Sequence, residues 1–219
     1  MRIIVMDTEV FKHDWIAIFL DTTSGGWSVF HNDNGGVRQL MNQQDQIFCG
    51  YNNKHYDNHI LKAICCGADP AMVKQINDFI IRDERPGWEH YFLRNNRFWF
   101  ESFDLMDDTQ VGTSLKHIEA HLGWNIEETE VDFNLDRPLT QEEIDRTIHY
   151  CKWDVTATAK LLTLRKGYLT AKLNVARSKG ISDTKALYMT NARLTAAYLD
   201  ATPTVRYDER EYQYPENLD

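Results

Sequence analysis

The chain has 219 residues and a formal net charge of −9 at pH 7, with 33 acidic against 24 basic side chains. This balance argues against tight, nonspecific coating of duplex nucleic acid, which requires a basic face, but it leaves open a nucleic-acid enzyme that recruits metal ions. A hydrophobic content of 42% and an aromatic content of 12% exclude a disordered chain and are sufficient for one sizeable domain with a core.

Membrane contact and compartment also follow from the composition. No apolar stretch has the length needed to cross a bilayer, so no membrane association is expected. The N-terminus leads directly into a strand pattern, and no signal or transit peptide is expected. Cys49, Cys65, Cys66 and Cys151 lack the CxxC spacing of a metal site, which favours buried thiols in the reducing cytoplasm.

Three strands are predicted at the start of the chain. Residues 2–8 form an apolar run, and residues 14–21 and 27–31 alternate or run apolar. A turn signal at 22–26 joins the last two, so the three strands are expected to be consecutive and antiparallel. The next segments predict a short helix over 36–44 and a short buried strand over 46–50.

Helices dominate the predicted middle of the chain. Residues 55–66 carry a helical period that Gly67 ends. Asp69 followed by Pro70 is typical of a helix start, and this helix is expected to run to about residue 81. Two further elements are expected, a strand over 97–103 and a helix over 114–122 that Gly123 ends.

The C-terminal part is also predicted to be helical. Residues 140–143 (TQEE) form a capping-box pattern, which starts a long helix running to about Leu173. A last helix is expected over 183–200, before a polar tail. The order of elements predicts an α/β fold, with a mixed sheet of three antiparallel strands and later parallel additions, flanked by helices.

The predicted first strand ends in two acids, Asp7 and Glu9. Several acid-x-acid pairs occur in this acidic chain, and solvated charge is the ordinary interpretation for those in loops or on helix surfaces. Asp7 and Glu9 differ because they end an apolar strand, in which residues i and i+2 face the same side. Two partly buried like charges repel, so either the strand end is solvated or a cation lies between them.

A second polar segment is GYNNKHYD at 50–57, which follows a predicted buried strand. Asp57 falls in the first turn of the next helix, where an acid often only compensates the helix dipole. The preceding side chains favour a binding role as well, with Asn52 or Asn53 orienting a sugar or phosphate and Tyr56 packing beneath a base.

A third group lies about three turns into the helix predicted to begin near Thr140. Tyr150 and Asp154 are four residues apart and share a helix face. A solvated Tyr–Asp pair is the ordinary alternative, but Ile148 and Val155 indicate that this side of the helix faces the core.

These three motifs, taken in order, resemble those of the DEDD 3′–5′ exonucleases, a DnaQ-like group with an RNase H-like fold. The matching residues are Asp7-x-Glu9, Tyr56-Asp57 after an asparagine, and Tyr150-x-x-x-Asp154. The tyrosine is similar to that of the DEDDy branch, which includes the proofreading domains of family A and family B DNA polymerases. The wider phrases GYNNKHYDNHILKAI and YCKWDVTAT resemble the N-terminal exonuclease regions of bacteriophage DNA polymerases.

His149 introduces an ambiguity, because it lies five residues before Asp154 and the sister branch uses His-x4-Asp. In that branch the histidine lies on a loop before the helix, whereas here the helix is predicted to begin near Thr140. On a continuous helix His149 lies about 140° from Asp154, and Tyr150 lies only about 40° away. We therefore expect Tyr150 to be the functional residue.

The resemblance implies phosphodiester hydrolysis with two divalent ions, Mg²⁺ or Mn²⁺, as cofactors. It implies that Asp7 bridges both ions and that Glu9 and Asp154 hold the ion carrying the attacking water. Asp57 would act on the second ion's side through water. Tyr150 would orient the attacking water, since a phenol with a pKa of about 10 is a poor base at neutral pH.

Substrate contacts are implied by the same resemblance. The backbone at Thr8 and Val10 and the side chain of Phe11 would contact the terminal nucleotide. The family often has threonine where Val10 stands, a departure that concerns the contact to the 3′ end and not the metal site. Single-stranded ends are usually held by aromatic stacking, and the candidates are Phe92, Trp99 and Trp153. For each of the three, a place in the core is the favoured interpretation.

We therefore expect a 3′–5′ exodeoxyribonuclease that acts on the 3′ end of single-stranded or frayed DNA and releases nucleotide monophosphates. A phage-encoded chain would act in the cytoplasm of its bacterial host. Residues 1–175 would form the exonuclease domain, and residues 176–219 a C-terminal helix and a polar tail that resembles a link into a polymerase domain. The alternatives are a 3′–5′ exoribonuclease or short-oligonucleotide degrader of the same fold, and a non-catalytic nucleic-acid-binding module. The presence of all four acids favours an enzyme.

Overall fold

The computed structural model describes residues 2–109, 112–127 and 131–201. The chain divides into two compact units, Met1–Thr170 and Ala171–Asp219. The predicted domain boundary near residue 175 lies within one continuous helix, α6 (Gln141–Ser178), and so does the division between the two units. Among the described residues, no helix is long and apolar enough to span a membrane.

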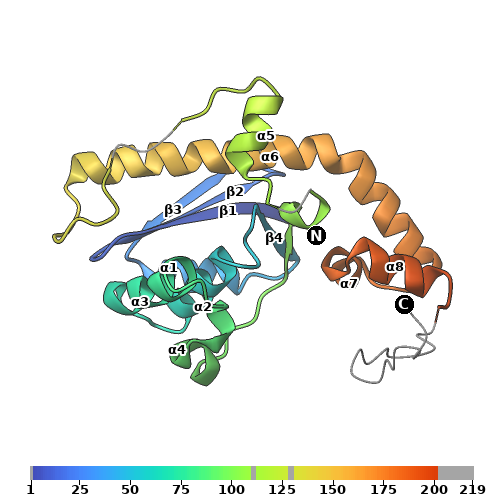
Figure 1. The fold of residues 1–219 in the computed structure, drawn as a ribbon, viewed down its shortest axis with the longest axis horizontal. Coiled ribbons are helices and arrows are strands. Elements are labelled where there is room, and N and C mark those ends of the chain that lie inside the picture. The colour runs from blue at the N-terminus through green and yellow to red at the C-terminus, as the bar shows by residue number, and fades with distance from the viewer. Residues whose placement is uncertain (1, 110–111, 128–130, 202–219) are drawn as a thin grey trace, which may run out of the picture. The chain divides into compact units, whose positions relative to one another are not determined.

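The first unit is built on a mixed sheet with the strand order β3-β2-β1-β4-β5 (Figure 1). Its strands are β1 (Arg2–Val10), β2 (Trp15–Asp21), β3 (Trp27–His31), β4 (Gln46–Gly50) and β5 (Ser102–Asp104). The first three strands pair antiparallel, and β4 and β5 add in parallel to β1. The predicted α/β fold with three antiparallel strands and parallel additions is therefore confirmed.

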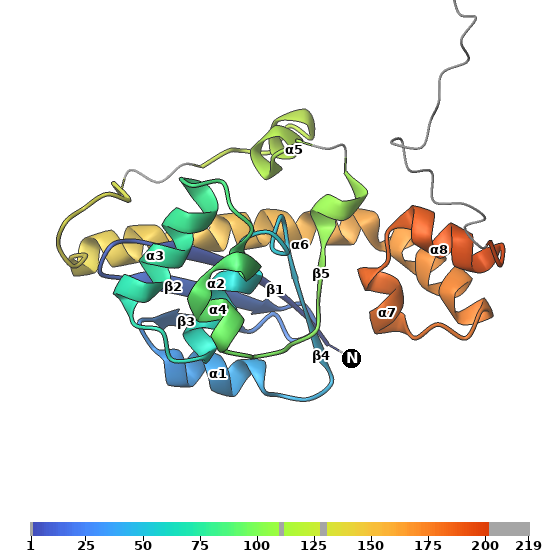
Figure 2. The same cartoon turned by 60° about the horizontal axis from the view of Figure 1, so that its bottom comes forward.

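One face of the sheet is covered by helices α1 (Asn34–Met41), α2 (Asp57–Cys65), α3 (Pro70–Ile81) and α4 (Tyr91–Asn95) (Figure 2). Alternate residues of β1, Ile4 and Met6, bury their side chains in the same core as Ile60 and Ile64 of α2. The side chain of Asp69 accepts a hydrogen bond from the Met72 amide, as the predicted helix start requires. The apolar contacts pack α2 against β1.

The other face carries α6 and the shorter helix α5 (Leu115–His121) (Figure 1). The capping box is formed as predicted: the Thr140 amide donates to Glu143 Oε2 at 2.8 Å, and the Glu143 amide donates to Thr140 Oγ1 at 3.3 Å. Buried Asp14, just before β2, accepts a hydrogen bond from the Leu139 amide at 2.8 Å. This bond ties the start of α6 to the sheet. The helix continues to Ser178, a few residues beyond the predicted end.

The strand predicted over 97–103 is wrong over residues 97–101. β5 contains only Ser102–Asp104, and Trp99 is 72% exposed. The parallel register pairs Phe48 with Ser102, so residues 97–99 precede the start of β4 at Gln46 and have no partner on that strand. Three short elements were not predicted, namely α4 and the 3-10 turns Gly87–Glu89 and Leu105–Asp108.

The second unit contains the end of α6 followed by α7 (Asp183–Tyr188) and α8 (Asn191–Tyr198). The single helix predicted over 183–200 is wrong, because Met189 is extended (φ −76°, ψ 136°) and Thr190 caps α8 by accepting a hydrogen bond from the Arg193 amide. A small core holds this unit together, formed by buried Ala176, Ala186, Met189 and Leu194. The predicted polar tail at 202–219 lies outside the described residues.

Candidate active site

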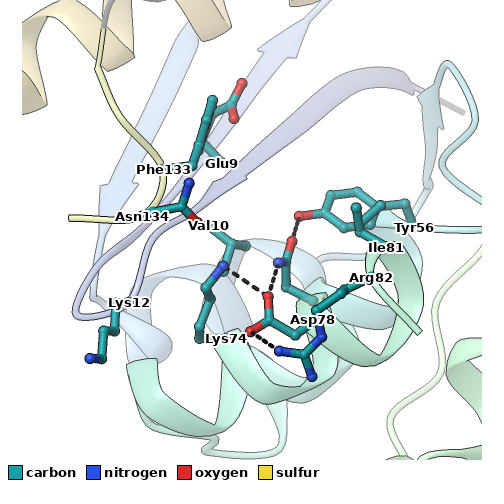
Figure 3. Close-up of a pocket in the computed structure, with 11 residues that line it drawn as sticks. Glu9, Val10, Lys12, Tyr56, Lys74, Asp78, Ile81, Arg82, Phe133 and Asn134 are labelled. Atoms are coloured by element: carbon teal, nitrogen blue, oxygen red, sulfur yellow. Dashed lines mark hydrogen bonds and ion pairs between the residues drawn. The ribbon is translucent and has the colours of Figure 1, made fainter. Parts of the chain in front are cut away.

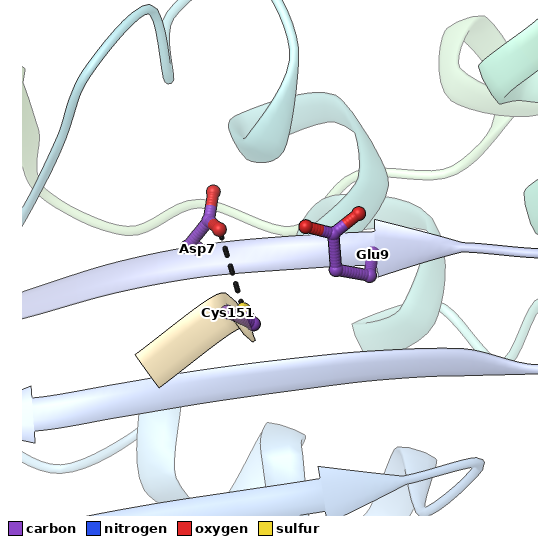
Figure 4. Close-up of side chains that lie close together, drawn as sticks. All are labelled: Asp7, Glu9 and Cys151. Carbon is purple, nitrogen blue, oxygen red and sulfur yellow. Dashed lines mark hydrogen bonds between the residues drawn. The ribbon is translucent and has the colours of Figure 1, made fainter. Parts of the chain in front are cut away.

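Asp7 and Glu9 lie on the same side of β1, as their spacing predicted. Both residues are partly buried on this central strand of the sheet. Figure 4 shows the two carboxylates on the strand and the thiol of Cys151 approaching Asp7 from α6. This thiol donates a hydrogen bond to Asp7 Oδ2 at 3.2 Å. The ligand atoms of Asp7, Glu9 and Cys151 all lie within 4.8 Å of one another, which makes them a group able to hold a metal ion.

Asp57, the first residue of α2, is 3% exposed and lies against β1. The hydroxyl of Thr8 donates to its Oδ1 at 2.6 Å. The preceding turn is fixed by Asp104 at the end of β5, which accepts hydrogen bonds from the amides of Asn52 and Lys54 at 2.8 and 2.9 Å. The sheet thus holds both the strand end and the helix start that carry these acids.

A glycine is required where β4 enters this turn. A Cβ at Gly50 would come within 2.7 Å of the Cβ of Asn53, so any side chain there would push the turn away. Asn52 adopts a positive φ of 65°, a conformation that asparagine tolerates better than most residues. The sequence GYNN is therefore suited to this tight turn.

Tyr150 and Asp154 come from α6. Asp154 Oδ1 accepts a hydrogen bond at 2.5 Å from the ammonium of Lys116, which also lies 5.0 Å from the centre of the Tyr150 ring. His149 points elsewhere: its side chain is 74% exposed and lies 3.2 Å from Glu127. Of the two residues that fit the sequence motif, Tyr150 is therefore the one placed near the acids.

The electrostatics of the acids show that they share one environment. Burial, followed by the charges of Asp57, Glu9 and Asp154, raises the pKa of Asp7 well above its usual range. Burial, followed by the charges of Asp154 and Asp57, raises the pKa of Glu9 to about 8. Burial likewise raises the pKa of Asp57 to about 7, although its bond from Thr8 acts in the opposite direction. Carboxylates that destabilise one another in this way favour either a proton or a bound cation.

The pKa of the Tyr150 hydroxyl is also raised, first by burial and then by the charges of Asp154 and Glu9. The phenol therefore stays protonated at neutral pH. A protonated hydroxyl can donate a hydrogen bond but cannot act as a base.

The residues predicted to contact the terminal nucleotide are mostly buried. The side chain of Thr8 bonds Asp57, and Val10 is 4% exposed. The ring of Phe11 is 1% exposed and stacks on Phe133, with the ring centres 4.9 Å apart. In this structure Phe11 therefore does not present a free ring to a ligand.

The amides and the tyrosine of the second motif have separate environments. The backbone amide of Asn52 donates a hydrogen bond to Asp104. The side chain of fully buried Asn53 donates a hydrogen bond to Asn58 Oδ1 at 3.1 Å. The hydroxyl of Tyr56 donates to Asn77 Oδ1 at 2.7 Å. Tyr56 alone of these three lines a cavity next to the acids.

The three aromatic candidates for base stacking differ in exposure. Phe92 packs against the core between the sheet and its helices. Trp99 is exposed. Trp153 donates from its indole nitrogen to the Asn125 carbonyl at 3.2 Å, and the ammonium of Lys160 lies over its ring.

A groove of about 470 Å³ opens beside the acids (Figure 3). The groove is lined by Glu9, which is one of these acids, by Tyr56, by Phe133 and by residues of α3. Asp78 of α3 bonds Lys74 at 2.8 Å and lies 4.0 Å from Arg82. The groove therefore combines an aromatic wall with basic side chains that are already paired.

Sequence reasoning missed two residues of this site, Lys116 and Cys151. Lys116 precedes Asp154 by 38 positions, and no local sequence pattern predicts the hydrogen bond between them. Cys151 had a signal that was not used: it lies three residues before Asp154, so the two share a helix face.

Comparisons with known proteins identify the fold. No protein-family model matches the chain, and no curated protein matches it by sequence. The chain is similar in structure to the family B DNA polymerase of the hyperthermophilic archaeon Pyrobaculum calidifontis, with a TM-score of 0.57 and 14% identity. The match covers 92% of this chain and 29% of the polymerase. The fold is therefore an α/β mixed sheet of the RNase H-like kind found in part of that polymerase.

Proposed function

We propose that this chain is a metal-dependent 3′–5′ exonuclease that hydrolyses the terminal phosphodiester of single-stranded or frayed DNA. The observation that carries the proposal is the meeting of four carboxylates from three distant segments, each affecting the ionisation of another. They are Asp7, Glu9, Asp57 and Asp154. One buried acid, Asp57, and three partly buried acids are costly to hold together without a bound cation, and a protein that only needed to fold would gain by replacing them.

The donor atoms fit magnesium or manganese. Carboxylate oxygens are the hard ligands that these ions prefer. Burial and the charges of neighbouring acids raise the pKa values of Asp7 and Glu9, and a bound cation would offset both effects. Asp7, Glu9 and Asp154 would hold the ions directly, and Asp57 would do so directly or through water. When bound, two such ions activate the attacking water and stabilise the leaving 3′ oxygen.

The chain's own residues then orient the reactants. The protonated hydroxyl of Tyr150 donates a hydrogen bond to the attacking water and fixes its direction. Thr8 favours the ionised form of Asp57 and holds its carboxylate in place by donating a hydrogen bond to Oδ1. Lys116 holds Asp154 in place and offsets part of the negative charge.

The groove beside Glu9 supports a nucleic-acid substrate. It adjoins the acids and has room for a nucleotide, with Tyr56 and Phe133 available to a base. We assign the 3′ end of a DNA strand to this place and a nucleotide monophosphate as the product. The resemblance of the motifs to bacteriophage polymerase exonucleases favours a proofreading role beside a polymerase domain, in the cytoplasm of a bacterial host.

Gel-resolved digestion of a 5′-labelled single-stranded DNA tests the proposal. We expect a ladder that shortens from the 3′ end with Mg²⁺ or Mn²⁺ and disappears with EDTA. Asp7→Ala and Asp154→Asn should each lower the rate by a factor on the order of 10³. Asp145→Asn is the matched control, because Asp145 is an exposed acid on the same helix and accepts a hydrogen bond from the side chain of Gln141.

The outcomes separate the candidate functions. Shortening of an RNA oligonucleotide alone would replace the DNA substrate with RNA. If the folded protein cleaves neither the DNA nor the RNA oligonucleotide, the proposal is overturned. Nucleic-acid binding without catalysis is then the remaining candidate function.

The assignment of Tyr150 has its own test. Tyr150→Phe should lower the cleavage rate about 10- to 100-fold, because the attacking water loses its hydrogen-bond donor. His149→Ala should leave the rate unchanged, since His149 is exposed and paired with Glu127. The reverse pattern would assign the chain to the histidine branch.

A further inference from the structure

Glu119 is a buried carboxylate that the proposed mechanism does not use. It lies on α5 with a relative exposure of 0%, and among the described residues neither of its carboxylate oxygens accepts a hydrogen bond. Burying a carboxylate without hydrogen bonds is costly, and evolution usually removes such a group unless it serves a purpose. The nearest cation is the ammonium of Lys116, which lies 3.7 Å from Glu119 Oε2.

Lys116 lies three residues earlier on the same helix, so the two side chains share a face. Its ammonium bonds Asp154 Oδ1 at 2.5 Å and the carbonyl of Glu127 at 2.8 Å. The ammonium therefore lies between two carboxylates and is hydrogen-bonded to only one of them. A small rotation of the flexible lysine stem is enough to exchange one carboxylate for the other.

We propose that Glu119 is a second ion-pair partner for the Lys116 ammonium, which moves from Asp154 to Glu119 when a divalent ion binds the acids. This inference rests on the proposed function, because it requires that Asp154 is an ion ligand. Without the ion, Lys116 neutralises Asp154. With the ion, Glu119 receives the displaced ammonium.

Electrostatics gives the exchange a direction. A divalent ion on Asp154 repels an ammonium at hydrogen-bonding distance from the same carboxylate, and this repulsion is strong where water is scarce. If the lysine had no other partner, ion binding would leave it buried and unpaired. When Lys116 pairs with Glu119, the lysine keeps an ion-pair partner. The full negative charge of Asp154 is then available to the ion. Glu119 is thus a positioning residue that acts through Lys116, and it does not touch the reacting atoms.

The test measures ion binding in the absence of any DNA. Free Mn²⁺ is followed by electron paramagnetic resonance during titration of the full chain, and circular dichroism confirms that each variant is folded. Four proteins form a double-mutant cycle: the unaltered chain, Lys116→Met, Glu119→Gln and the double variant. Both substitutions keep the size of the side chain and remove its charge. Lys160→Met is the matched control, because Lys160 is exposed on α6 and lies over Trp124 and Trp153 instead of an acid.

We expect Lys116→Met to tighten Mn²⁺ binding about tenfold, because it removes the competitor for Asp154. Glu119→Gln should weaken Mn²⁺ binding about tenfold in the unaltered background, because the displaced ammonium then has no carboxylate to pair with. In the Lys116→Met background the same Glu119→Gln change should have no effect. Lys160→Met should bind like the unaltered chain.

Two results would overturn the inference. An equal effect of Glu119→Gln in both backgrounds would mean that Glu119 acts as an isolated charge or through folding and not through Lys116. No effect in either background would mean that Glu119 takes no part in ion binding, while the proposed exonuclease would stand. Absence of Mn²⁺ binding by the unaltered chain would contradict the proposed function itself, and the inference with it.

Discussion

The position of Asp57 depends on one hydroxyl, that of Thr8, which donates to Asp57 Oδ1 at 2.6 Å in a buried setting. Thr8→Val keeps the shape of the side chain and removes this donor. Because the hydrogen bond lowers the pKa of Asp57, its loss raises that pKa above about 7 and leaves more of the carboxyl protonated at neutral pH. We expect the rate of DNA cleavage at pH 7 to fall about tenfold and to recover partly at pH 9. A loss of equal size at both pH values would mean that Thr8 acts only by packing.

The raised pKa values of the acids also predict how stability depends on pH. The pKa of Glu9 is about 8 in the folded chain against 4.5 for the free side chain, so the folded state binds this proton more tightly than the unfolded state. The contribution of Glu9 to the free energy of unfolding is therefore fully present below about pH 4.5 and is lost as the pH rises towards 8. Without metal, the free energy of unfolding from urea titrations should fall over this window by an amount on the order of 3 kcal/mol.

Glu9→Gln supplies the control for this pH dependence, since glutamine resembles the protonated acid and does not titrate. The variant should lose less stability over the same window. Mn²⁺ should restore the unaltered chain at pH 8 and stabilise the variant less. Identical pH profiles for the two proteins would contradict the assignment of this titration to Glu9.

At the scale of elements, Asp14 joins the sheet to α6. One carboxylate oxygen lies 2.6 Å from His31 Nε2 and accepts from the side chain of Asn32, and the other accepts from the Leu139 amide. Asp14→Ala leaves the buried Leu139 amide without its partner and should lower the free energy of unfolding by about 2–4 kcal/mol. Urea titration measures this change. Asp33→Ala, which removes the cap of α1 on the surface, should cost only about 1 kcal/mol and serves as the comparison.

Local sequence signals predicted those elements whose boundaries depend on nearby residues. The Asp69-Pro70 start and the capping box at Thr140 work through bonds within a few positions, and both formed as expected. β5 and the break at Met189 depend on more distant partners. β5 is limited by its register against β4, which begins only at Gln46, and α7 and α8 pack on a core that includes Ala176. Apolar content alone therefore predicted too long a strand and too long a helix.

The candidate site shows the same division at the scale of the whole molecule. The period of a strand placed Asp7 and Glu9 on one side, and the period of a helix placed Tyr150, and not His149, near the acids. No period predicts that Lys116 on α5 reaches Asp154 on α6, because that contact depends on how the two helices pack. The catalytic roles stay predictions until the variants are measured.

The second unit should be the weaker of the two, because its core is small. Leu194→Ala removes one of the few large buried side chains of this unit, which otherwise relies on Leu187, Met189 and alanines. We expect the free energy of local opening to fall by about 2–3 kcal/mol, so amide hydrogen exchange in α7 and α8 should accelerate at least about tenfold. Exchange in β1 and β4, and the rate of DNA cleavage, should stay within about twofold of the unaltered chain, since these lie in the other unit. Leu164→Ala is the matched control, because Leu164 is 61% exposed on α6. Faster exchange in β1 together with slower cleavage would show instead that the two units unfold as one.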